Sequence, residues 1–509
     1  MSGIVAIVGD SDLSVDDILD RMPHRGENLR SIKHFEGFGS LGTNLFMIQD
    51  PENGRQPLFN EDGSIACVMN GEIYNHRALR RDLAQRHDFR SLSDAEVLLH
   101  LYEEYGDDLV EFLDGMFAFV LFDLKQGRFI AARDPLGIKP LWYRIDGQRT
   151  VIASEAKALR GFEGGDIQEL LPGMLLSSSS PPLTYHEHDL KTSEPDHALC
   201  RSLLQAAVRK QTVGGSRLGV FLSGGVDSSI IAALAAQENP KIKAYTVGVE
   251  GAADVEMARR VADFLDIEHT VRTFTIDELN QVVDEAIFIT ESYNPSTITS
   301  AAVTLLAARA AQEDSVRVIL SGDGADELFG GHAAVRCFSY LELKLALEAM
   351  LGNLHRTELR RLDSITMSAK IEARVPYLDR DFVEYAFNLP SDEKIHEVGG
   401  RRIEKWHLRQ SFEGLLPDEF IWRDEMKMDL GSGSANLVPY IESAVSDEEF
   451  EAGRQRYAAW NILSKEMLYY FEIWKRHFGD SLQPGRTFEM FGDYPILMSE
   501  IADRGANQK

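Results

Sequence analysis

Short apolar or alternating runs dominate the first 160 residues of the chain. Apolar side chains that recur at every second position, or continuously over a few positions, are typical of β-strands. Such runs occupy residues 3–8, 64–68, 117–122, 129–132 and 151–153. Helical periodicity separates them at residues 77–86 and 95–105. Because strands outnumber helices, this part predicts stacked sheets flanked by helices.

After His197 the pattern changes to strand, glycine loop and helix. Apolar strands that alternate with helices are typical of a parallel sheet. The strands are predicted at 218–222, 242–249 and 316–320, and the helices at 228–237 and 255–265. From Cys337 onward the periodicity is mostly helical. The run Ser177–Pro182 has the composition of a turn or linker, so we predict two domains, 1–190 and 195–509; the alternative is a surface loop within one domain.

Composition limits the classes of partner. A chain of 509 residues exceeds a single core. Its formal net charge of −28 repels phosphate backbones, so we expect neither nucleic acid nor an anionic membrane as a partner. An ATP site in so acidic a chain needs Mg2+ and local Lys or Arg. Three scattered cysteines, no signal sequence and no apolar run of about 20 residues lead us to expect a reduced, cytoplasmic protein.

The segment Leu222–Ser229, with the sequence LSGGVDSS, lies between a predicted strand and a predicted helix. Its two glycines allow backbone N–H groups to turn toward an anion, its serines add donors, and the helix N-terminus adds partial positive charge. Asp227 would repel phosphate unless a metal stood between them, so we assign it to Mg2+. We predict a loop that binds the pyrophosphate of ATP; the alternative is an ordinary helix-capping turn.

A second predicted strand runs into the carboxylate-rich loop Ser321–Gly331, SGDGADELFGG. Gly322 and Gly324 permit close backbone approach. Asp326 is a second candidate Mg2+ ligand, and Asp323 points to the reacting centre. Alone, the loop could be a solvated acidic turn; beside a pyrophosphate loop it predicts a metal site.

Together these segments resemble the asparagine synthetase superfamily, which includes the β-lactam and carbapenam synthetases. The resemblance covers nearly the whole chain. It implies an α/β protein with an N-terminal-nucleophile amidotransferase-like αββα sandwich, joined to a PP-loop ATP pyrophosphatase-type α/β domain with a helical C-terminus. It also implies ATP and Mg2+ as cofactors and a homodimer. Besides the two loops it is carried by His24–Gly26, Gln56–Phe59, Asn70–Asn75, Arg133–Leu141 and Glu372–Asp379.

The resemblance also implies a reaction. A carboxylate attacks the α-phosphate of ATP to give an acyl-adenylate and pyrophosphate, and a nitrogen nucleophile then displaces AMP to form an amide. Glu425 stands in the column of the family's catalytic Lys, and Lys427 stands two residues later. An ion pair of Glu372 with Arg374 and a solvated Lys427 stay open as alternatives. The implied catalytic residues are Asp323, Glu372 and Lys427; the metal ligands are Asp227 and Asp326; the ATP-binding residues are Leu222, Ser223, Gly224, Gly225, Asp227, Ser228, Val247, Gly248 and Gly322.

The N-terminal half departs from the glutamine-dependent pattern of this superfamily. Ser2 stands where the catalytic Cys would be, and a hydroxyl is far less acidic than a thiol. Leu45 stands where an Arg grips the carboxylate of glutamine, although Asn70 and Gly71 of the oxyanion hole and Asp94 are kept. Two losses in one site predict a glutaminase-inactive first domain and a glutamine-independent enzyme.

The substrate side departs as well. Thr299 stands where asparagine synthetases carry an Arg, which would cost aspartate a charge-assisted hydrogen bond worth about 1.5–3 kcal/mol. Asp323 matches the asparagine synthetases, whereas Gly431–Ser434 resembles the β-lactam synthetases. We therefore favour a lactam synthetase of antibiotic biosynthesis, acting on an amino-acid-like substrate that bears both carboxylate and amine. The alternatives are an ammonia-dependent asparagine synthetase-like amide ligase and a non-catalytic nucleotide-binding protein.

Overall fold

The computed structural model describes residues 2–479 except 10–12, 27–28, 49, 51–52, 148, 163–164, 188–190, 213–216, 425 and 427, together with Leu482. The chain divides into two compact units, Met1–His188 and Asp189–Gly479. Among the described residues, no helix combines the length and the apolar character that a membrane span needs.

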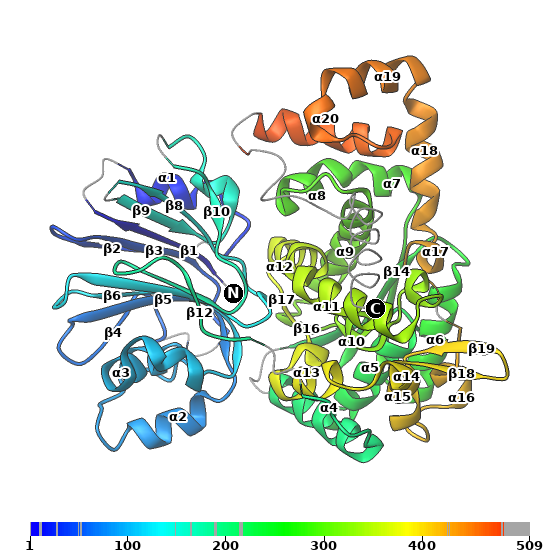
Figure 1. Cartoon of the computed structure of the whole chain (residues 1–509), viewed down its shortest axis with the longest axis horizontal. Coiled ribbons are helices and arrows are strands. Elements are labelled where there is room, and N and C mark those ends of the chain that lie inside the picture. Colours follow the sequence, from blue (N-terminus) through cyan, green and yellow to red (C-terminus); the bar gives the residue numbers. More distant parts are fainter. Residues whose placement is uncertain are drawn as a thin grey trace. The chain divides into compact units, whose positions relative to one another are not determined.

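The first unit is a sandwich of two six-stranded sheets between helices (Figure 1). The sheet orders are β10-β8-β9-β1-β3-β2 and β12-β11-β7-β6-β5-β4. Helix α1 (Val15–Leu19) packs on the first sheet, and α3 (Glu96–Tyr105), next to α2 (His76–Leu83), packs on the second. The strands are β1 Gly3–Val8, β2 Leu29–Phe35, β3 Gly39–Leu45, β4 Leu58–Phe59, β5 Ile65–Ile73, β6 Gly115–Asp123, β7 Arg128–Arg133, β8 Trp142–Asp146, β9 Arg149–Ala153, β10 Gln168–Glu169, β11 Met174–Ser177 and β12 Leu183–Thr184.

Strand β6 shows why the sequence of this unit is so apolar. Phe117 and Phe119 belong to the core cluster shared with Leu98 of α3, whereas Val120 belongs to the cluster shared with Ile4 of β1. Side chains alternate between the faces of a strand, so one face packs on the helices and the other on the opposite sheet. A strand buried on both faces reads as a continuous apolar run.

The second unit is built on a five-stranded parallel sheet of order β15-β14-β13-β16-β17. The carboxyl ends of β13, β14 and β16 therefore meet at one edge, where ligands bind in open α/β sheets. The strands are β13 Leu218–Phe221, β14 Lys243–Gly248, β15 Glu268–Thr273, β16 Val318–Leu320 and β17 Glu372–Arg374, and a separate hairpin is formed by β18 Ile395–Val398 and β19 Arg401–Glu404.

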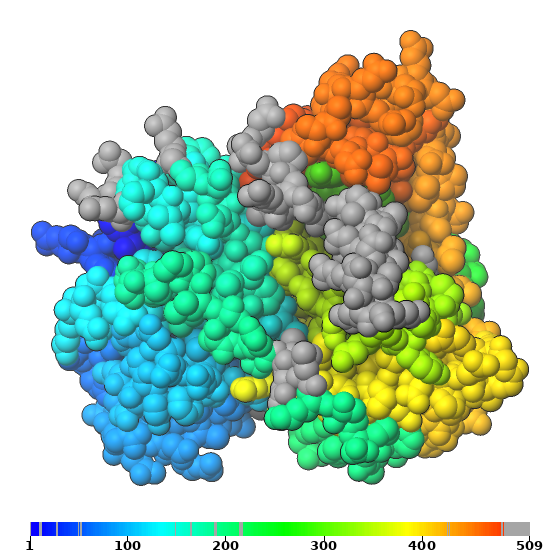
Figure 2. All heavy atoms as spheres, in the orientation of Figure 1, coloured from blue at the N-terminus to red at the C-terminus, as the bar shows by residue number. Residues whose placement is uncertain are grey.

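Helices surround this sheet and make up most of the chain after β16. Helices α18 and α20 pack together, and α20 also covers α8 and α9, so the last three helices form one side of this unit (Figures 1 and 2). The helices are α4 His197–Thr212, α5 Val226–Glu238, α6 Ala253–Leu265, α7 Ile276–Gln281, α8 Val283–Thr290, α9 Pro295–Glu313, α10 Ala325–Phe329, α11 Tyr340–Asn353, α12 Glu358–Ser368, α13 Arg380–Phe387, α14 Ser391–Lys394, α15 Trp406–Ser411, α16 Asp418–Ile421, α17 Met428–Ser432, α18 Leu437–Ala444, α19 Asp447–Arg456 and α20 Lys465–Phe478.

The α/β class, the sandwich and the parallel sheet are confirmed, and β1 has the predicted bounds. The periodicity missed strands such as β2, whose residues are partly or fully exposed and therefore carry little apolar signal. The run Ser177–Pro182 is not a linker, because it joins β11 to β12 in an antiparallel hairpin within the first unit.

The glycines of the first unit provide a test of sheet pairing. Gly71 (φ 137°) lies so close to β6 that an added Cβ would be 2.0 Å from the Met116 carbonyl oxygen, whereas Gly63 (φ 74°) has open space. We expect Gly63→Ala to lower the free energy of unfolding by about 1–2 kcal/mol, the cost of a left-handed backbone. Gly71→Ala also brings the new Cβ into collision with the Met116 carbonyl oxygen, so it should lower the free energy of unfolding, measured by urea denaturation, more than Gly63→Ala does. Equal losses would contradict this packing.

Candidate active site

The first loop of the predicted ATP site follows β13 and leads into α5. Leu222 is buried, and its N–H donates to the Tyr245 carbonyl oxygen at 3.0 Å. Gly224 has φ 77°, and an added Cβ would lie 2.7 Å from the Ala258 nitrogen. The turn therefore requires glycine at this position for both conformation and space.

Ser223 and Ser228 close this loop. Their hydroxyl oxygens lie 3.0 Å apart, and the Ser223 N–H donates to Ser228 Oγ at 3.1 Å. The Gly225 N–H donates to Ser223 Oγ at 3.2 Å. Hydroxyl groups and N–H groups thus gather at the N-terminus of α5, a helix of 13 residues whose partial positive charge favours an anion. This arrangement suits phosphate oxygens.

The loop Ser321–Gly331 meets the first loop at the same edge of the sheet. Strand β16 pairs with β13 in parallel, so both loops leave carboxyl ends. Gly322 approaches α5 so closely that an added Cβ would lie 3.0 Å from the Ser228 nitrogen and 3.2 Å from Asp227 Cβ. Two segments almost 100 positions apart in sequence therefore form one site.

Lys405 joins the two predicted metal ligands. Its Nζ lies 2.5 Å from Asp227 Oδ2 and 2.6 Å from Asp326 Oδ1, and its side chain is fully buried. An added Cβ at Gly331 would lie 1.9 Å from Asp326 Oδ1 and 2.1 Å from Lys405 Cε, so glycine leaves room for this pair. Two carboxylates beside a phosphate-binding loop fit Mg2+, which binds one or two carboxylates together with substrate phosphates.

Charged groups keep Asp326 ionised. Burial would raise the pKa of its carboxyl, but the charges of Lys405 and His332 outweigh burial and lower it. Burial would likewise lower the pKa of His332, but its hydrogen bond with Glu327, 2.8 Å long, raises that pKa to about 9. At neutral pH the metal-ligand position therefore carries a carboxylate flanked by two cations.

Asp323 is held in place by Arg361 of α12. The Arg361 guanidinium pairs with Asp323 Oδ1 and, at 2.6 Å, with Glu358, and the Ser321 hydroxyl donates to Asp323 Oδ2. Arg361 also donates to Thr304 Oγ1 of α9 at 2.6 Å. Burial would lower the pKa of Arg361, but Glu358 and Asp323 raise it. The Asp323 carboxylate is thus fixed in direction at the end of β16.

The remaining predicted residues differ in their surroundings. Glu372 is fully buried on β17 and pairs with Arg374 at 2.7 Å, which is the structural role that the sequence left open. Val247 and Gly248 end β14, where an added Cβ at Gly248 would lie 2.6 Å from Val255 Cγ2. Lys427 lies outside the described residues.

Three basic residues of this site were missed from the sequence. Arg423 donates to the Gly224 carbonyl oxygen at 2.9 Å and to Asp254 Oδ1 at 2.7 Å, so it braces the phosphate loop. Lys405 pairs with Asp227 and Asp326, and Arg361 pairs with Asp323. The acidity of the chain signalled that such cations were needed, but no local motif identified which ones.

In the first unit, Ser2 and Asn70 are brought together. The Ser2 N–H donates to Asn70 Oδ1 at 2.9 Å, and the Phe46 N–H donates to Ser2 Oγ at 3.2 Å. Within the described part of the chain, Asn70 Nδ2 is buried without a hydrogen-bond acceptor, as a donor of an oxyanion hole would be. Leu45 is buried at the end of β3 and offers a carboxylate no partner.

Two further residues of that N-terminal pattern are built into strand β5 and its surroundings. Gly71 pairs with Phe117 in the β5–β6 ladder. Asp94 Oδ2 accepts the Ile73 N–H at 2.7 Å, and Asp94 is buried just before α3. The framework of the pattern is therefore retained around Ser2.

Comparisons with known proteins cover both units. Residues 1–181 match the glutamine amidotransferase domain, and residues 199–340 and 338–481 match asparagine synthase. The chain is 33% identical to glutamine-hydrolyzing asparagine synthetase 3 of Arabidopsis thaliana, over 94% of this chain and 88% of that protein. It is 34% identical to a probable glutamine-hydrolyzing asparagine synthetase of Schizosaccharomyces pombe, over 84% of each. A solved allosteric regulatory enzyme of purine biosynthesis aligns at a TM-score of 0.32 and 18% identity, over 53% of this chain and 80% of that one.

Lys405 can be tested against a second buried lysine. Lys405→Met leaves the Asp227 and Asp326 carboxylates without their shared ammonium, so we expect the free energy of unfolding in EDTA to fall by about 3–5 kcal/mol. Millimolar Mg2+ should restore much of this loss, because a cation replaces the ammonium. In Lys394→Met, whose Nζ donates to the Phe387 carbonyl oxygen at 2.9 Å, Mg2+ should restore nothing. Equal effects of Mg2+ on both variants in urea denaturation would contradict the assignment.

Proposed function

Because the chain belongs to the asparagine synthase family, we propose that it is an ATP-dependent carbon–nitrogen ligase that forms AMP and pyrophosphate. The observation that carries this proposal is the meeting of the phosphate loop with two carboxylates, Asp227 and Asp326, around the buried ammonium of Lys405. A nucleotide-binding protein without catalysis has no need of two metal ligands at one phosphate site.

The reaction follows from the two loops. The Ser223–Ser228 loop holds the two outer phosphates of ATP, while a carboxylate oxygen of the substrate attacks the α-phosphorus and the bond to pyrophosphate breaks. Asp227 and Asp326 would hold Mg2+, which would supply positive charge to offset that of the leaving pyrophosphate. Lys405 and Arg423 add fixed positive charge beside the same phosphates. A nitrogen lone pair then attacks the acyl carbon, AMP leaves with the bonding electrons, and the nitrogen loses a proton.

Asp323, Glu372 and Lys427 are proposed to act in the second step, in which the nitrogen attacks the acyl carbon. Asp323 is the group best placed for it, because it lies on the Ser321–Gly331 loop and Arg361 fixes its direction. Glu372 would act only if its ion pair with Arg374 opened. We also propose that the protein is a homodimer, as the family resemblance implies.

The nitrogen comes from a source other than glutamine. Ser2 replaces the thiol with a hydroxyl that accepts a hydrogen bond from Phe46, and Leu45 replaces the Arg that would hold a glutamine carboxylate. Burial of that carboxylate against Leu45 without a partner costs several kcal/mol, on the order of the penalty for an unpaired buried charge. The first unit then serves as a scaffold.

The substrate differs from aspartate because Thr299, at the position that would hold the second carboxylate of aspartate, carries no positive charge. Thr299 on α9 is buried and lies 3.3 Å from both Glu466 Oε1 and Tyr470 Oη of α20. Burial raises the pKa of Glu466. A carboxylate placed beside Thr299 would lack the charge-assisted hydrogen bond that an Arg would give.

Helix α9 also connects Thr299 with Asp323. Thr304, five positions after Thr299, accepts the hydrogen bond from Arg361, which in turn holds Asp323. We therefore favour a substrate that carries an amine as well as a carboxylate, closed intramolecularly in the manner of a lactam synthetase. Ring closure within one adenylate gives the amine a very high effective concentration.

A second candidate is an ammonia-dependent amide ligase of the asparagine synthetase type. The acidic residue at Asp323 favours it, and the curated relatives are named asparagine synthetases. The two candidates differ in the acceptor of the activated acyl group, not in the chemistry of ATP.

The ATP chemistry can be measured as pyrophosphate and AMP release with a panel of amino-acid-like substrates. Asp227→Asn and Asp326→Asn should each slow pyrophosphate release by about 100-fold or more, because the metal loses a ligand where charge develops. The matched control is Asp392→Asn, at an exposed position, and this variant should release pyrophosphate at the normal rate. Rapid turnover with aspartate plus ammonium would exclude the ring-closing candidate, and near-normal rates in either site variant would refute the metal assignment.

Glutamine use can be measured as glutamate release. The protein should release none, and Ser2→Ala should leave AMP formation with the working nitrogen source unchanged, because the hydroxyl takes no part in it. The double variant Ser2→Cys/Leu45→Arg, which restores both missing groups, serves as the positive comparison. Glutamate formed by the natural chain and lost in Ser2→Ala would overturn glutamine independence.

A further inference from the structure

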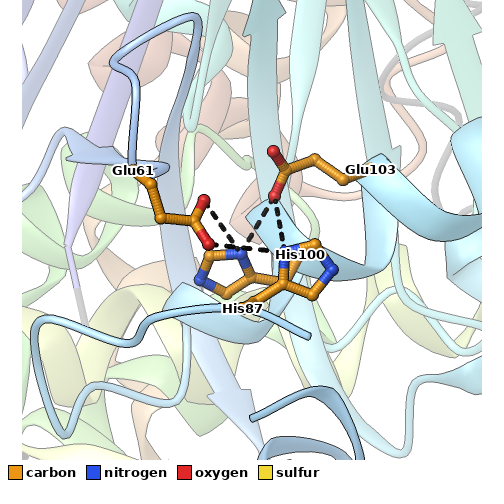
Figure 3. A group of neighbouring side chains, drawn as sticks. All are labelled: Glu61, His87, His100 and Glu103. Carbon is orange, nitrogen blue, oxygen red and sulfur yellow. Dashed lines mark hydrogen bonds and ion pairs between the residues drawn. The ribbon is translucent and has the colours of Figure 1, made fainter. Parts of the chain in front are cut away.

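Four side chains of the first unit converge on one point that neither site described above uses. Glu61 lies in the turn between β4 and β5, His87 follows α2, and His100 and Glu103 lie on α3 (Figure 3). One ligand atom from each of them lies within 4.8 Å of the others. Two imidazoles and two carboxylates together form a set of donors suited to a metal.

The separations between the imidazole nitrogens and the nearest carboxylate oxygens are close to those around a small cation, and the two histidines meet different oxygens of Glu61. His87 Nδ1 lies 3.4 Å from Glu61 Oε1 and 3.4 Å from Glu103 Oε2. His100 Nδ1 lies 3.0 Å from Glu103 Oε2 and 3.8 Å from Glu61 Oε2. Ligands held at about 2.0–2.1 Å from a tetrahedral ion stand about 3.3–3.4 Å from one another. The distances between the imidazole and carboxylate atoms scatter around that value.

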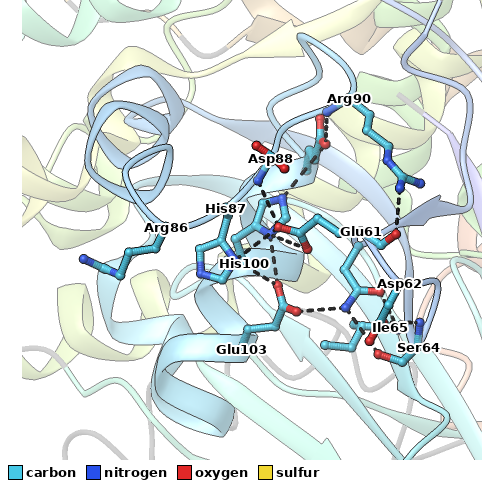
Figure 4. Close-up of polar contacts among 12 residues, drawn as sticks. Glu61, Asp62, Ser64, Ile65, Arg86, His87, Asp88, Arg90, His100 and Glu103 are labelled. Carbon is cyan, nitrogen blue, oxygen red and sulfur yellow. Dashed lines mark hydrogen bonds and ion pairs between the residues drawn. The ribbon is translucent and has the colours of Figure 1, made fainter.

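Two of the four ligands, His87 and Glu103, are also oriented by hydrogen bonds to the atom that faces away from the centre. His87 Nε2 pairs with Glu104 Oε1 at 2.9 Å, leaving Nδ1 to face the centre. Asn60 Nδ2 donates to Glu103 Oε1 at 2.8 Å, which leaves Glu103 Oε2 to face the histidines. The Asp88 N–H donates at 2.9 Å to Glu61 Oε1, the oxygen that also faces His87 Nδ1 (Figure 4). An imidazole whose outer nitrogen meets a carboxylate is the usual arrangement of a metal-binding histidine.

Burial gives this cluster a second reason to hold a cation. The His100 side chain is 0% exposed and that of His87 12% exposed. The two imidazole rings stack with their centroids 4.7 Å apart. The Phe89 ring makes an edge contact with His100, with the centroids 4.5 Å apart. His87 Nδ1 lies 3.4 Å from a carboxylate oxygen of Glu61 and of Glu103, longer than an ordinary hydrogen bond, so the three groups leave room for a small cation between them.

We propose that Glu61, His87, His100 and Glu103 form a structural site for a zinc-type divalent cation. Nitrogen donors exclude Mg2+ and Ca2+ as preferred ions, whereas mixed imidazole and carboxylate donors suit Zn2+. Four protein ligands would close the coordination sphere, as in structural sites. The cation would tie the β4–β5 turn and the segment after α2 to helix α3.

The test uses the full chain, stripped with a chelator and titrated with Zn2+, or with Co2+ as a spectroscopic probe, in excess Mg2+. One equivalent of Zn2+ should bind and raise the unfolding temperature, and Co2+ should give the strong visible absorption of tetrahedral sites. His87→Gln and Glu103→Gln should each weaken binding by about 100-fold, and Glu104→Gln by about 10-fold. His34→Gln, an exposed histidine of β2, is the matched control and should bind normally.

The outcomes separate this site from the ATP site. Asp326→Asn should keep the Zn2+ equivalent and the Co2+ spectrum; if that variant loses them, the cation belongs to the second unit and the proposal fails. The proposal also fails if His87→Gln and Glu103→Gln, both folded by circular dichroism, bind Zn2+ like the natural chain, or if the natural chain binds no Zn2+ in excess Mg2+.

Discussion

One buried ammonium group organises the synthetase site. Lys405 reaches the Asp227 and Asp326 carboxylates at once, and without a cation between them these two groups would repel each other at the end of the sheet. Its position fixes the distance between the phosphate loop and the acidic loop. The rest of the site follows from this constraint: Gly331 must lack a side chain, Gly322 must approach α5 closely, and other cations must balance the remaining charge.

Away from this centre, three positions carry neutral residues where the family resemblance implies reactive or charged ones. The two loops gather hydroxyl groups, N–H groups and carboxylates at one edge of the sheet, whereas Ser2, Leu45 and Thr299 are neutral residues at positions where the family resemblance implies Cys, Arg and Arg. All three side chains are buried: Ser2 lies just before β1, Leu45 ends β3 and Thr299 lies on α9.

The first unit is built to be rigid whether or not it hydrolyses glutamine. Strand β6 is buried on both faces, so both sheets and the α2–α3 layer depend on it. The cluster of Glu61, His87, His100 and Glu103 lies in that layer and joins segments that share no strand pairing. Contacts of this kind hold the layer together whichever nitrogen source the protein uses.

The sequence by itself determined the α/β class, most strands and helices near the two sites, the family, and the acidic residues Asp227 and Asp326, because each of these leaves a local signal in periodicity or in a glycine-rich loop. Only the tertiary structure decided which distant residues contact these groups. Lys405 meets Asp227 across 178 positions, Arg423 meets Gly224 across 199, and Glu61 meets His100 across a helix and a hairpin. Contacts between distant residues depend on how the sheet orders its strands, and no local pattern records that order.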